Sequence, residues 1–168
     1  LLNRIEFLGA KNFILPLYGR SEMNNINYKT FLKSFKEIIK ILEKKKINIL
    51  LETNINFSVF EKFKSLLGKK IYLVFDTGNR VIKNKKLASE ILEFKSSIKL
   101  VHIKNRDKYY RNIKLKGGLV NFDEIFRALK KIKYKNNFTI ESTRLRNAFY
   151  TGKNNAKMIK TLIKKYLR

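Results

Sequence analysis

The segment YLVFDTGN, residues 72–79, decides how this sequence is expected to fold. Apolar and aromatic residues run without interruption up to Asp76, and small or polar residues follow it. A short run that is apolar on both faces is typical of a parallel strand covered by helices on each side, although such a run alone also fits a buried helix. The acid at its end fits either a surface turn or the rim of a functional site.

Four other segments share the length of this run and its content of β-branched and aromatic residues. These strand candidates lie at residues 13–18, 47–52, 98–103 and 138–143, and the run itself extends over 71–76. Between them the apolar residues recur at helical spacing, most clearly within residues 28–45. Further helices are expected at about 58–67, 86–94, 122–132 and 147–166. Asn121 is a suitable N-cap for the third of these, since two acids follow it in the first turn.

Strand and helix therefore alternate five times, which predicts an α/β fold with a parallel sheet or barrel and the helices outside it. The chain has 168 residues, 44% of them hydrophobic, and one proline. No low-complexity linker divides it. We expect one domain over residues 1–168.

The amino-acid composition excludes several classes of protein. The chain has no cysteine, so it has no disulfide, no thiolate metal ligand and no cysteine nucleophile, and we expect a cytoplasmic protein. No apolar run approaches the roughly 18 residues that span a bilayer, which argues against a membrane protein. The sequence leaves a homo-oligomer open.

The formal net charge is +26, which would suit a nucleic acid or another polyanion. The lysines are, however, spread from Lys11 to Lys165 and fall mostly on the outer faces of the expected helices. We interpret them as a solvated surface, with polyanion binding as the alternative. A salt-sensitive gel shift on generic DNA or RNA would favour that alternative.

Four side chains that can bind a metal come at or near the ends of four successive strand candidates. They are Glu52, Asp76, His102 and Glu141. The carboxyl ends of parallel strands meet at one edge, where active sites of α/β folds are built. Taken singly, a carboxylate at a strand end often caps the next helix, and a lone histidine is often structural. Four such residues in register indicate a common site.

Three carboxylates and one imidazole form an oxygen-rich ligand set that suits one divalent ion, namely Mn²⁺, Mg²⁺, Co²⁺ or Zn²⁺. Open coordination positions would accept a carbonyl and a hydroxyl side by side. The metal would polarise the carbonyl and stabilise an enediolate, while a carboxylate removes a proton from carbon. This is the chemistry of an isomerase or epimerase.

Several motifs also carry a family resemblance. LLETN (50–54), VFDTGN (74–79), LVHIKNR (100–106) and LKGGLVNFDEIFRALKKIKYKNNFTIEST (115–143) together resemble the xylose isomerase-like (β/α)8 barrels of the AP endonuclease family 2 type, which include sugar phosphate isomerases and epimerases. The resemblance covers about residues 9–166 and matches roughly the fourth to eighth strands. It implies an incomplete TIM-barrel type fold of about the last five β/α units. Because the sequence also begins without methionine, we expect the C-terminal part of a longer barrel.

The resemblance also implies residue roles. Glu52, Asp76, His102 and Glu141 would be the metal ligands, and Glu52 and Glu141 would also act as acid and base on opposite faces of the substrate. The chain departs from the family where an acid is usual, at Asn105 and again at Asn121 in the GxVDF position.

The superfamily also contains endonuclease IV, whose three-metal cluster needs several histidines. This chain has one histidine and places Asn79 where that enzyme would need another, so DNA repair is the weaker interpretation. A further alternative is a catalytically impaired or basic anion-binding protein that keeps the scaffold.

The expected substrate is a small sugar or sugar phosphate. The segment 104–116 is basic and contains two tyrosines, and the topology places it beside the metal. Lys104 and Arg106, with Asn79, are the candidate substrate-binding residues, since Arg pairs with phosphate through two hydrogen bonds.

Overall fold

The computed structural model describes residues 2–24, 26–68, 70–84, 86–143 and 145–168. The chain divides into two compact units, Leu1–Val74 and Phe75–Arg168. The single domain expected over residues 1–168 stays a prediction.

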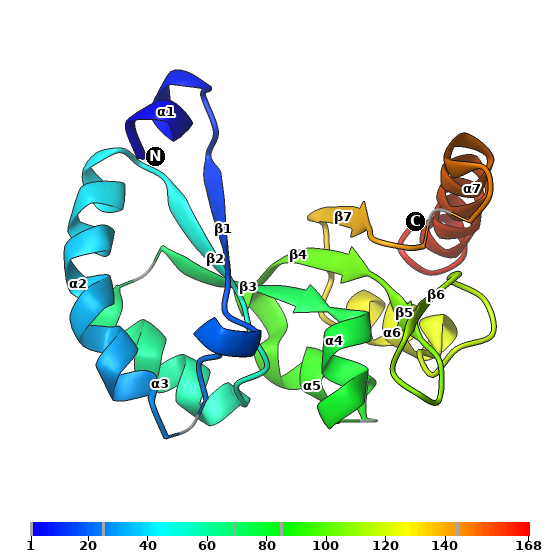
Figure 1. Ribbon diagram of the computed structural model, residues 1–168, viewed down its shortest axis with the longest axis horizontal. Helices are drawn as coiled ribbons and strands as arrows, with labels where there is room; N and C mark the ends of the chain where they lie inside the picture. The colour runs from blue at the N-terminus through cyan, green and yellow to red at the C-terminus, as the bar shows by residue number, and fades with distance from the viewer. Residues whose placement is uncertain (1, 25, 69, 85, 144) are drawn as a thin grey trace. The chain divides into compact units, whose positions relative to one another are not determined.

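Five strands form one sheet in the order β1-β2-β3-β4-β7, in which β1 pairs with β2, β2 with β3, and β4 with β7 in parallel. The strands are labelled in Figure 1. Their bounds are β1 Asn12–Pro16, β2 Asn48–Glu52, β3 Ile71–Asp76, β4 Ile98–Ile103 and β7 Asn137–Ile140. A second, two-stranded antiparallel sheet pairs β5 (Asn105–Arg106) with β6 (Asn112–Ile113). The expected parallel α/β arrangement is therefore present.

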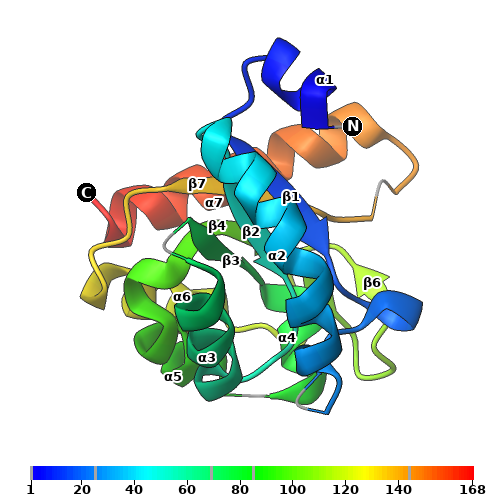
Figure 2. The same ribbon diagram turned by 90° about the vertical axis from the view of Figure 1, so that its left-hand side faces the viewer.

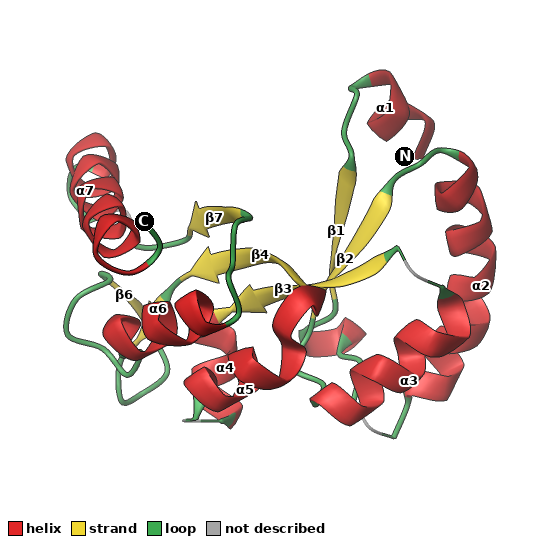
Figure 3. Cartoon of the chain, turned by 180° about the vertical axis from the view of Figure 1, so that it is seen from behind, coloured by secondary structure: helices red, strands yellow, loops and turns green. Residues whose placement is uncertain are grey.

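The first unit packs helices α2 and α3 against each other beside its strands, as Figure 3 shows. It contains α1 (Leu2–Phe7), the short 3-10 helix η1 (Gly19–Ser21), α2 (Tyr28–Lys44) and α3 (Phe57–Leu67). The buried face of α2 carries Phe35, whose ring meets that of Phe63 on α3 edge-on, with centroids 5.2 Å apart. Burying one such side chain stabilises the fold by about 1.5–3 kcal/mol, so the predicted apolar stripe holds this unit together.

The second unit contains α4 (Thr77–Lys83), α5 (Leu87–Phe94), the 3-10 helix η2 (Lys95–Ser97), α6 (Phe122–Lys131) and α7 (Ala148–Tyr166). Helices α5 and α6 lie side by side (Figure 2), and α6 contacts α7. Phe126 of α6 stacks on Phe138 of β7 with centroids 5.3 Å apart. Tyr134 meets the same ring edge-on, and its burial raises the pKa of its phenol. These rings anchor β7 and thereby the residue that follows it.

The expected elements are present with small shifts at their ends. The strand at 71–76 and the strand at 98–103 have the predicted bounds, whereas β7 ends at Ile140 instead of residue 143. Asn121 caps α6 as expected, since its side chain accepts a hydrogen bond from the Glu124 N–H. Helix α4 and the β5–β6 pair were not expected. Both were hidden because each is short and lacks apolar periodicity.

No helix among the described residues is both long and apolar enough to cross a bilayer.

A cluster of polar groups ties α7 to α6. The Lys165 ammonium lies 2.8 Å from Asp123 Oδ1, and the Tyr166 hydroxyl donates to the same oxygen. These hydrogen bonds hold the pKa of Asp123 below its usual value of 3.8. The ionised carboxylate therefore favours the folded state above that pH.

Replacing Asp123 by Asn is expected to lower the melting temperature at neutral pH by roughly 1–4 °C, a small effect because the pair is exposed. Since the folded pKa is the lower one, the contribution is present above pH 3.8 and is lost as the pH falls below it. Thermal melts from pH 7 to pH 3 test this. The exposed Glu93→Gln serves as the control, and a difference that persists unchanged at pH 3 would contradict the assignment.

Candidate functional site

Asp76 ends β3 and also caps α4. Its Oδ1 accepts a hydrogen bond from the Asn79 N–H at 2.7 Å, and its Oδ2 accepts one from Asn79 Nδ2 at 3.0 Å. The side chain is fully buried. Capping by a strand-end acid is one of the roles considered for this residue, and the structure shows it, while Oδ2 also faces the charged groups described next.

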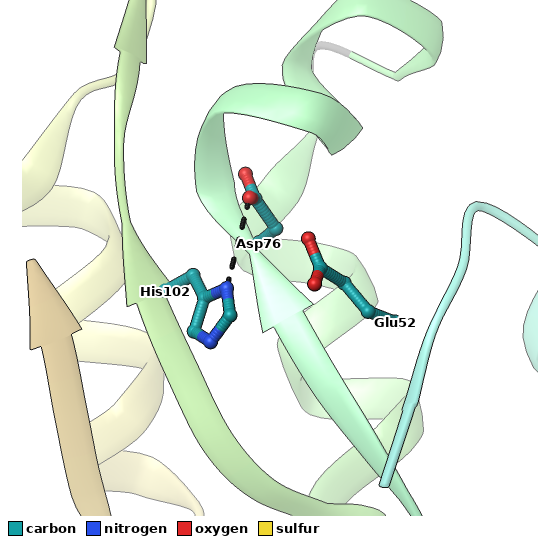
Figure 4. A group of neighbouring side chains, drawn as sticks. All are labelled: Glu52, Asp76 and His102. Atoms are coloured by element: carbon teal, nitrogen blue, oxygen red, sulfur yellow. Dashed lines mark ion pairs between the residues drawn. The ribbon is translucent and has the colours of Figure 1, made fainter. Parts of the chain in front are cut away.

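His102 and Glu141 are brought together by the register of two parallel strands. His102 pairs with Thr139, and Ile103 pairs with Ile140, so Glu141 follows immediately beyond the paired segment. The Glu141 N–H continues the ladder by donating to the Ile103 carbonyl. As a result, His102 Nδ1 lies 3.0 Å from Glu141 Oε1 and 3.9 Å from Asp76 Oδ2 (Figure 4 shows the second contact).

Lys104 reaches the same carboxylates. It lies two residues after His102, and side chains alternate along an extended chain, so both point to the same side. Its Nζ is 3.2 Å from Glu141 Oε2 and 3.7 Å from Asp76 Oδ2. The Lys104 side chain is 15% exposed and that of Glu141 is 37% exposed, so this edge of the cluster meets solvent.

Thr77 and Gly78 fix the position of Lys104. The Thr77 hydroxyl donates to the Lys104 carbonyl at 2.7 Å and accepts from the Lys104 N–H at 3.0 Å, which joins the start of α4 to the end of β4. A Cβ atom at Gly78 would lie 2.6 Å from Lys104 Cγ. Only glycine leaves room for the lysine stem to pass over this turn of the helix.

A second set of hydrogen bonds orients the Asn79 amide. Arg106 Nη2 donates to Asn79 Oδ1 at 2.7 Å, and Arg106 Nη1 donates to the Tyr110 carbonyl at 2.9 Å. With its oxygen held by the guanidinium, the Asn79 amide turns its nitrogen toward Asp76. The basic segment after β4 therefore helps to position an acid of the cluster. Substrate binding by Asn79 and Arg106 stays a prediction.

Asn105 organises the loop that follows β4. It is buried, its Oδ1 accepts from the Arg106 and Val120 N–H groups, and its Nδ2 donates to the Leu115 carbonyl at 2.7 Å. A carboxylate has no hydrogen to donate to that carbonyl. The departure from the usual acid at this position thus suits the loop of this chain.

Arg80 connects α4 to its neighbours in the second unit. Its guanidinium is buried between the rings of Phe75 and Phe94, 5.1 and 4.8 Å from their centroids, and pairs with Glu90 Oε2 at 3.0 Å. Stacking and ion pairing together connect the helix that Asp76 caps to α5.

Glu52 belongs to the first unit. It is the last residue of β2 and is buried, and its carbonyl accepts from the Leu17 N–H at 2.8 Å. Its register partners are Pro16 of β1 and Val74 of β3. The backbone thus places Glu52 at the carboxyl end of its strand, as the sequence indicated.

The donor set of the second unit fits a divalent ion. Two atoms that coordinate one ion at about 2.0–2.2 Å lie roughly 3–4 Å from each other. The separations of His102 Nδ1 from Glu141 Oε1 and from Asp76 Oδ2 fall in this range. Carboxylate oxygens and an imidazole nitrogen are ligands for zinc, manganese and related ions.

Sequence reasoning missed Thr77, Gly78 and the Arg80–Glu90 pair. One signal was available for the first two, because a glycine two residues after a strand-end acid is suited to a close approach of two segments. The Arg80 pair had no such signal, since its partners come together only when α4 packs on α5.

The chain belongs to the xylose isomerase-like TIM barrel family, whose model matches residues 1–166. The solved structures that share the fold include the following three. L-ribulose 3-epimerase superposes with a TM-score of 0.80 at 16% identity, covering 98% of this chain and 65% of that chain. A xylose isomerase domain protein from Planctomyces limnophilus superposes with a TM-score of 0.80 at 14% identity, covering 98% of this chain and 64% of that chain. The IOLI protein with a bound zinc atom superposes with a TM-score of 0.75 at 17% identity, covering 98% of this chain and 67% of that chain.

At identities this low the superpositions establish the fold. The predicted family resemblance and the predicted fold class, an incomplete α/β barrel of the TIM type, are confirmed. The chain spans 65% and 64% of the length of the first two structures. No curated protein gives a significant sequence match.

Replacing Asn105 by Asp is expected to destabilise the chain by about 1–3 kcal/mol, because the buried Leu115 carbonyl loses its donor and faces a carboxylate instead. Urea unfolding followed by circular dichroism measures the loss. Asn112→Asp makes the same chemical change at an exposed position of the neighbouring strand β6. Equal losses in the two variants would show that Asn105 has no special role.

Proposed function

We propose that the chain carries the site of a divalent-metal-dependent sugar or sugar-phosphate isomerase or epimerase. The observation that carries the proposal is the convergence of Asp76, His102 and Glu141 at the carboxyl ends of β3, β4 and β7. That end is where TIM-barrel enzymes build their active sites. Membership of the xylose isomerase-like family and the likeness to L-ribulose 3-epimerase support the reaction class.

The proposed metal ligands are Asp76, His102, Glu141 and Glu52. Glu52 is included because it ends β2, at the position where the family resemblance implies a ligand. Figure 4 labels three of these four residues, Glu52, Asp76 and His102. The zinc atom bound to the IOLI protein supports a single ion of the Zn²⁺, Mn²⁺, Co²⁺ or Mg²⁺ class.

When bound, the ion would polarise a substrate carbonyl and favour the enediolate form of the sugar. The residues of the chain would then move the protons. One of the two glutamates, Glu52 or Glu141, accepts the proton from the carbon next to the carbonyl. The other returns a proton from the opposite face, which inverts that carbon. The partial exposure of Glu141 is consistent with access for a substrate.

The substrate would be a sugar or sugar phosphate held at the solvent side of this cluster. Lys104 and Arg106 are the proposed partners for its anionic or hydroxyl groups, with Asn79 beside them. Arg106 already presents a planar group with several donors, although two of its nitrogens are occupied by Asn79 and the Tyr110 carbonyl.

Addition of Mn²⁺ or Zn²⁺ is expected to stabilise the folded chain. At a concentration about 100-fold above Kd, binding to the native state alone contributes about 2.7 kcal/mol, which raises the melting temperature by roughly 5–10 °C. Glu141→Gln should remove most of this rise, because the amide is a weaker ligand. Thermal melts with and without metal measure it.

Glu93→Gln, an exposed acid of α5, is the matched control and should keep the full rise. If the wild-type chain shows no metal-dependent rise, the metal-site proposal fails. The scaffold with an impaired site or a simple anion-binding role would then be the better interpretation.

Proton transfer can be tested in deuterated water. Incubation of the metal-loaded chain with a panel of ketoses and ketose phosphates should incorporate deuterium at the carbon next to the carbonyl, read by NMR. Glu52→Gln is expected to lower the rate by roughly 10²–10⁴-fold, the usual contribution of a general acid or base. Glu37→Gln on the exposed face of α2 controls for loss of charge. Exchange that is unaffected by Glu52→Gln would remove this residue from the mechanism.

A further inference from the structure

Lys104 makes ion pairs with two of the proposed metal ligands. Its ammonium lies 3.2 Å from Glu141 Oε2 and 3.7 Å from Asp76 Oδ2. On Asp76 it shares Oδ2 with His102, whose Nδ1 is 3.9 Å from that oxygen. The cation of the lysine therefore draws on the same negative charge that a divalent ion would use.

The surrounding residues hold the lysine in this position. The backbone N–H and carbonyl of Lys104 are both bonded to the Thr77 hydroxyl. Its stem crosses Gly78 at a distance that excludes any Cβ there. The backbone and the start of the stem of Lys104 are therefore fixed, and its ammonium lies within ion-pair distance of both acids.

The buried Asp76 carboxylate explains why a cation is needed. Removing a carboxylate from water is costly unless hydrogen bonds and an opposite charge compensate for it. Asn79 supplies two hydrogen bonds but no net charge. Lys104 Nζ, 3.7 Å from Asp76 Oδ2, and His102 Nδ1, 3.9 Å from the same oxygen, bring basic groups to the carboxylate.

We propose that Lys104 is a tethered cation that competes with the divalent ion for Asp76 and Glu141 and so sets the metal affinity of the site. This inference rests on the proposed function, since it presupposes that these carboxylates bind metal. A divalent ion on Asp76 and Glu141 repels an ammonium a few ångströms away. The lysine must then move outward, and its partial exposure leaves a path to solvent.

The ion pairs of Lys104 lower the affinity of the site for a metal ion. Each metal ion that binds must first displace the lysine from two carboxylates, so the observed affinity is lower than the ligand set alone would provide. Removing the ammonium while keeping the stem should therefore tighten metal binding. A lysine that only filled space or supported the fold would show no such effect when its charge is removed.

The test is calorimetric titration of Mn²⁺ into the chain and into the variants Lys104→Met and Lys104→Gln. Both keep most of the stem, and circular dichroism checks that they are folded. We expect both variants to bind Mn²⁺ about tenfold more tightly than the wild type does. The free energy of this change is smaller than the Coulomb energy between two charges at this separation. Lys108→Met is the matched control: Lys108 lies in the loop between β5 and β6, and its ammonium faces the Tyr109 ring. It should bind Mn²⁺ as the wild type does.

The possible outcomes separate the two proposals. Equal affinities in the wild type and in a folded Lys104 variant overturn the competition but leave the metal site in place. Tighter binding in Lys108→Met to the same degree also overturns it, because the effect would then be a general one of net charge. No binding by any of the four proteins overturns the metal site and the competition together. If one Lys104 variant fails to fold, the other decides the question.

Discussion

The buried carboxylate of Asp76 is the constraint on which the arrangement of the second unit depends. Its side chain is fully buried, and both oxygens are engaged, one by the Asn79 backbone and the other by the Asn79 amide. A charge in that position requires donors and cations around it. Helix α4, Lys104 and His102 meet this requirement together, so the same residue that starts a helix also organises the polar cluster.

The register of the parallel strands positions the other residues of the site. In a parallel pair, neighbouring residues point to the same face, and the chain after each strand emerges at the same edge. The pairing of Ile103 with Ile140 places Glu141 beside Lys104. His102, which pairs with Thr139, lies two residues before Lys104 on the same segment. Aromatic packing of Phe126 and Tyr134 on Phe138 holds that register from the opposite end of β7.

The electrostatic character of the cluster differs from that of the whole chain. The net charge is +26, yet carboxylates from different segments gather at this edge. The excess of lysine elsewhere favours long-range attraction of anions. Close to the carboxylates, however, a single restrained lysine decides how the negative charge is balanced. The overall charge thus affects association with anions, whereas the local charge affects the binding of cations.

The sequence by itself determined the fold class, the five strands and the four strand-end residues, because strand burial and helical periodicity are local patterns that leave a clear trace in residue order. It also identified Lys104, Arg106 and Asn79 as neighbours of the cluster. Only the tertiary structure decided that Asn79 is bonded to both Asp76 and Arg106, that Asn105 supports a loop, and that Lys104 is paired with two acids over Gly78. These contacts join residues that are up to 37 positions apart, and their geometry depends on register and helix packing, which no local pattern encodes.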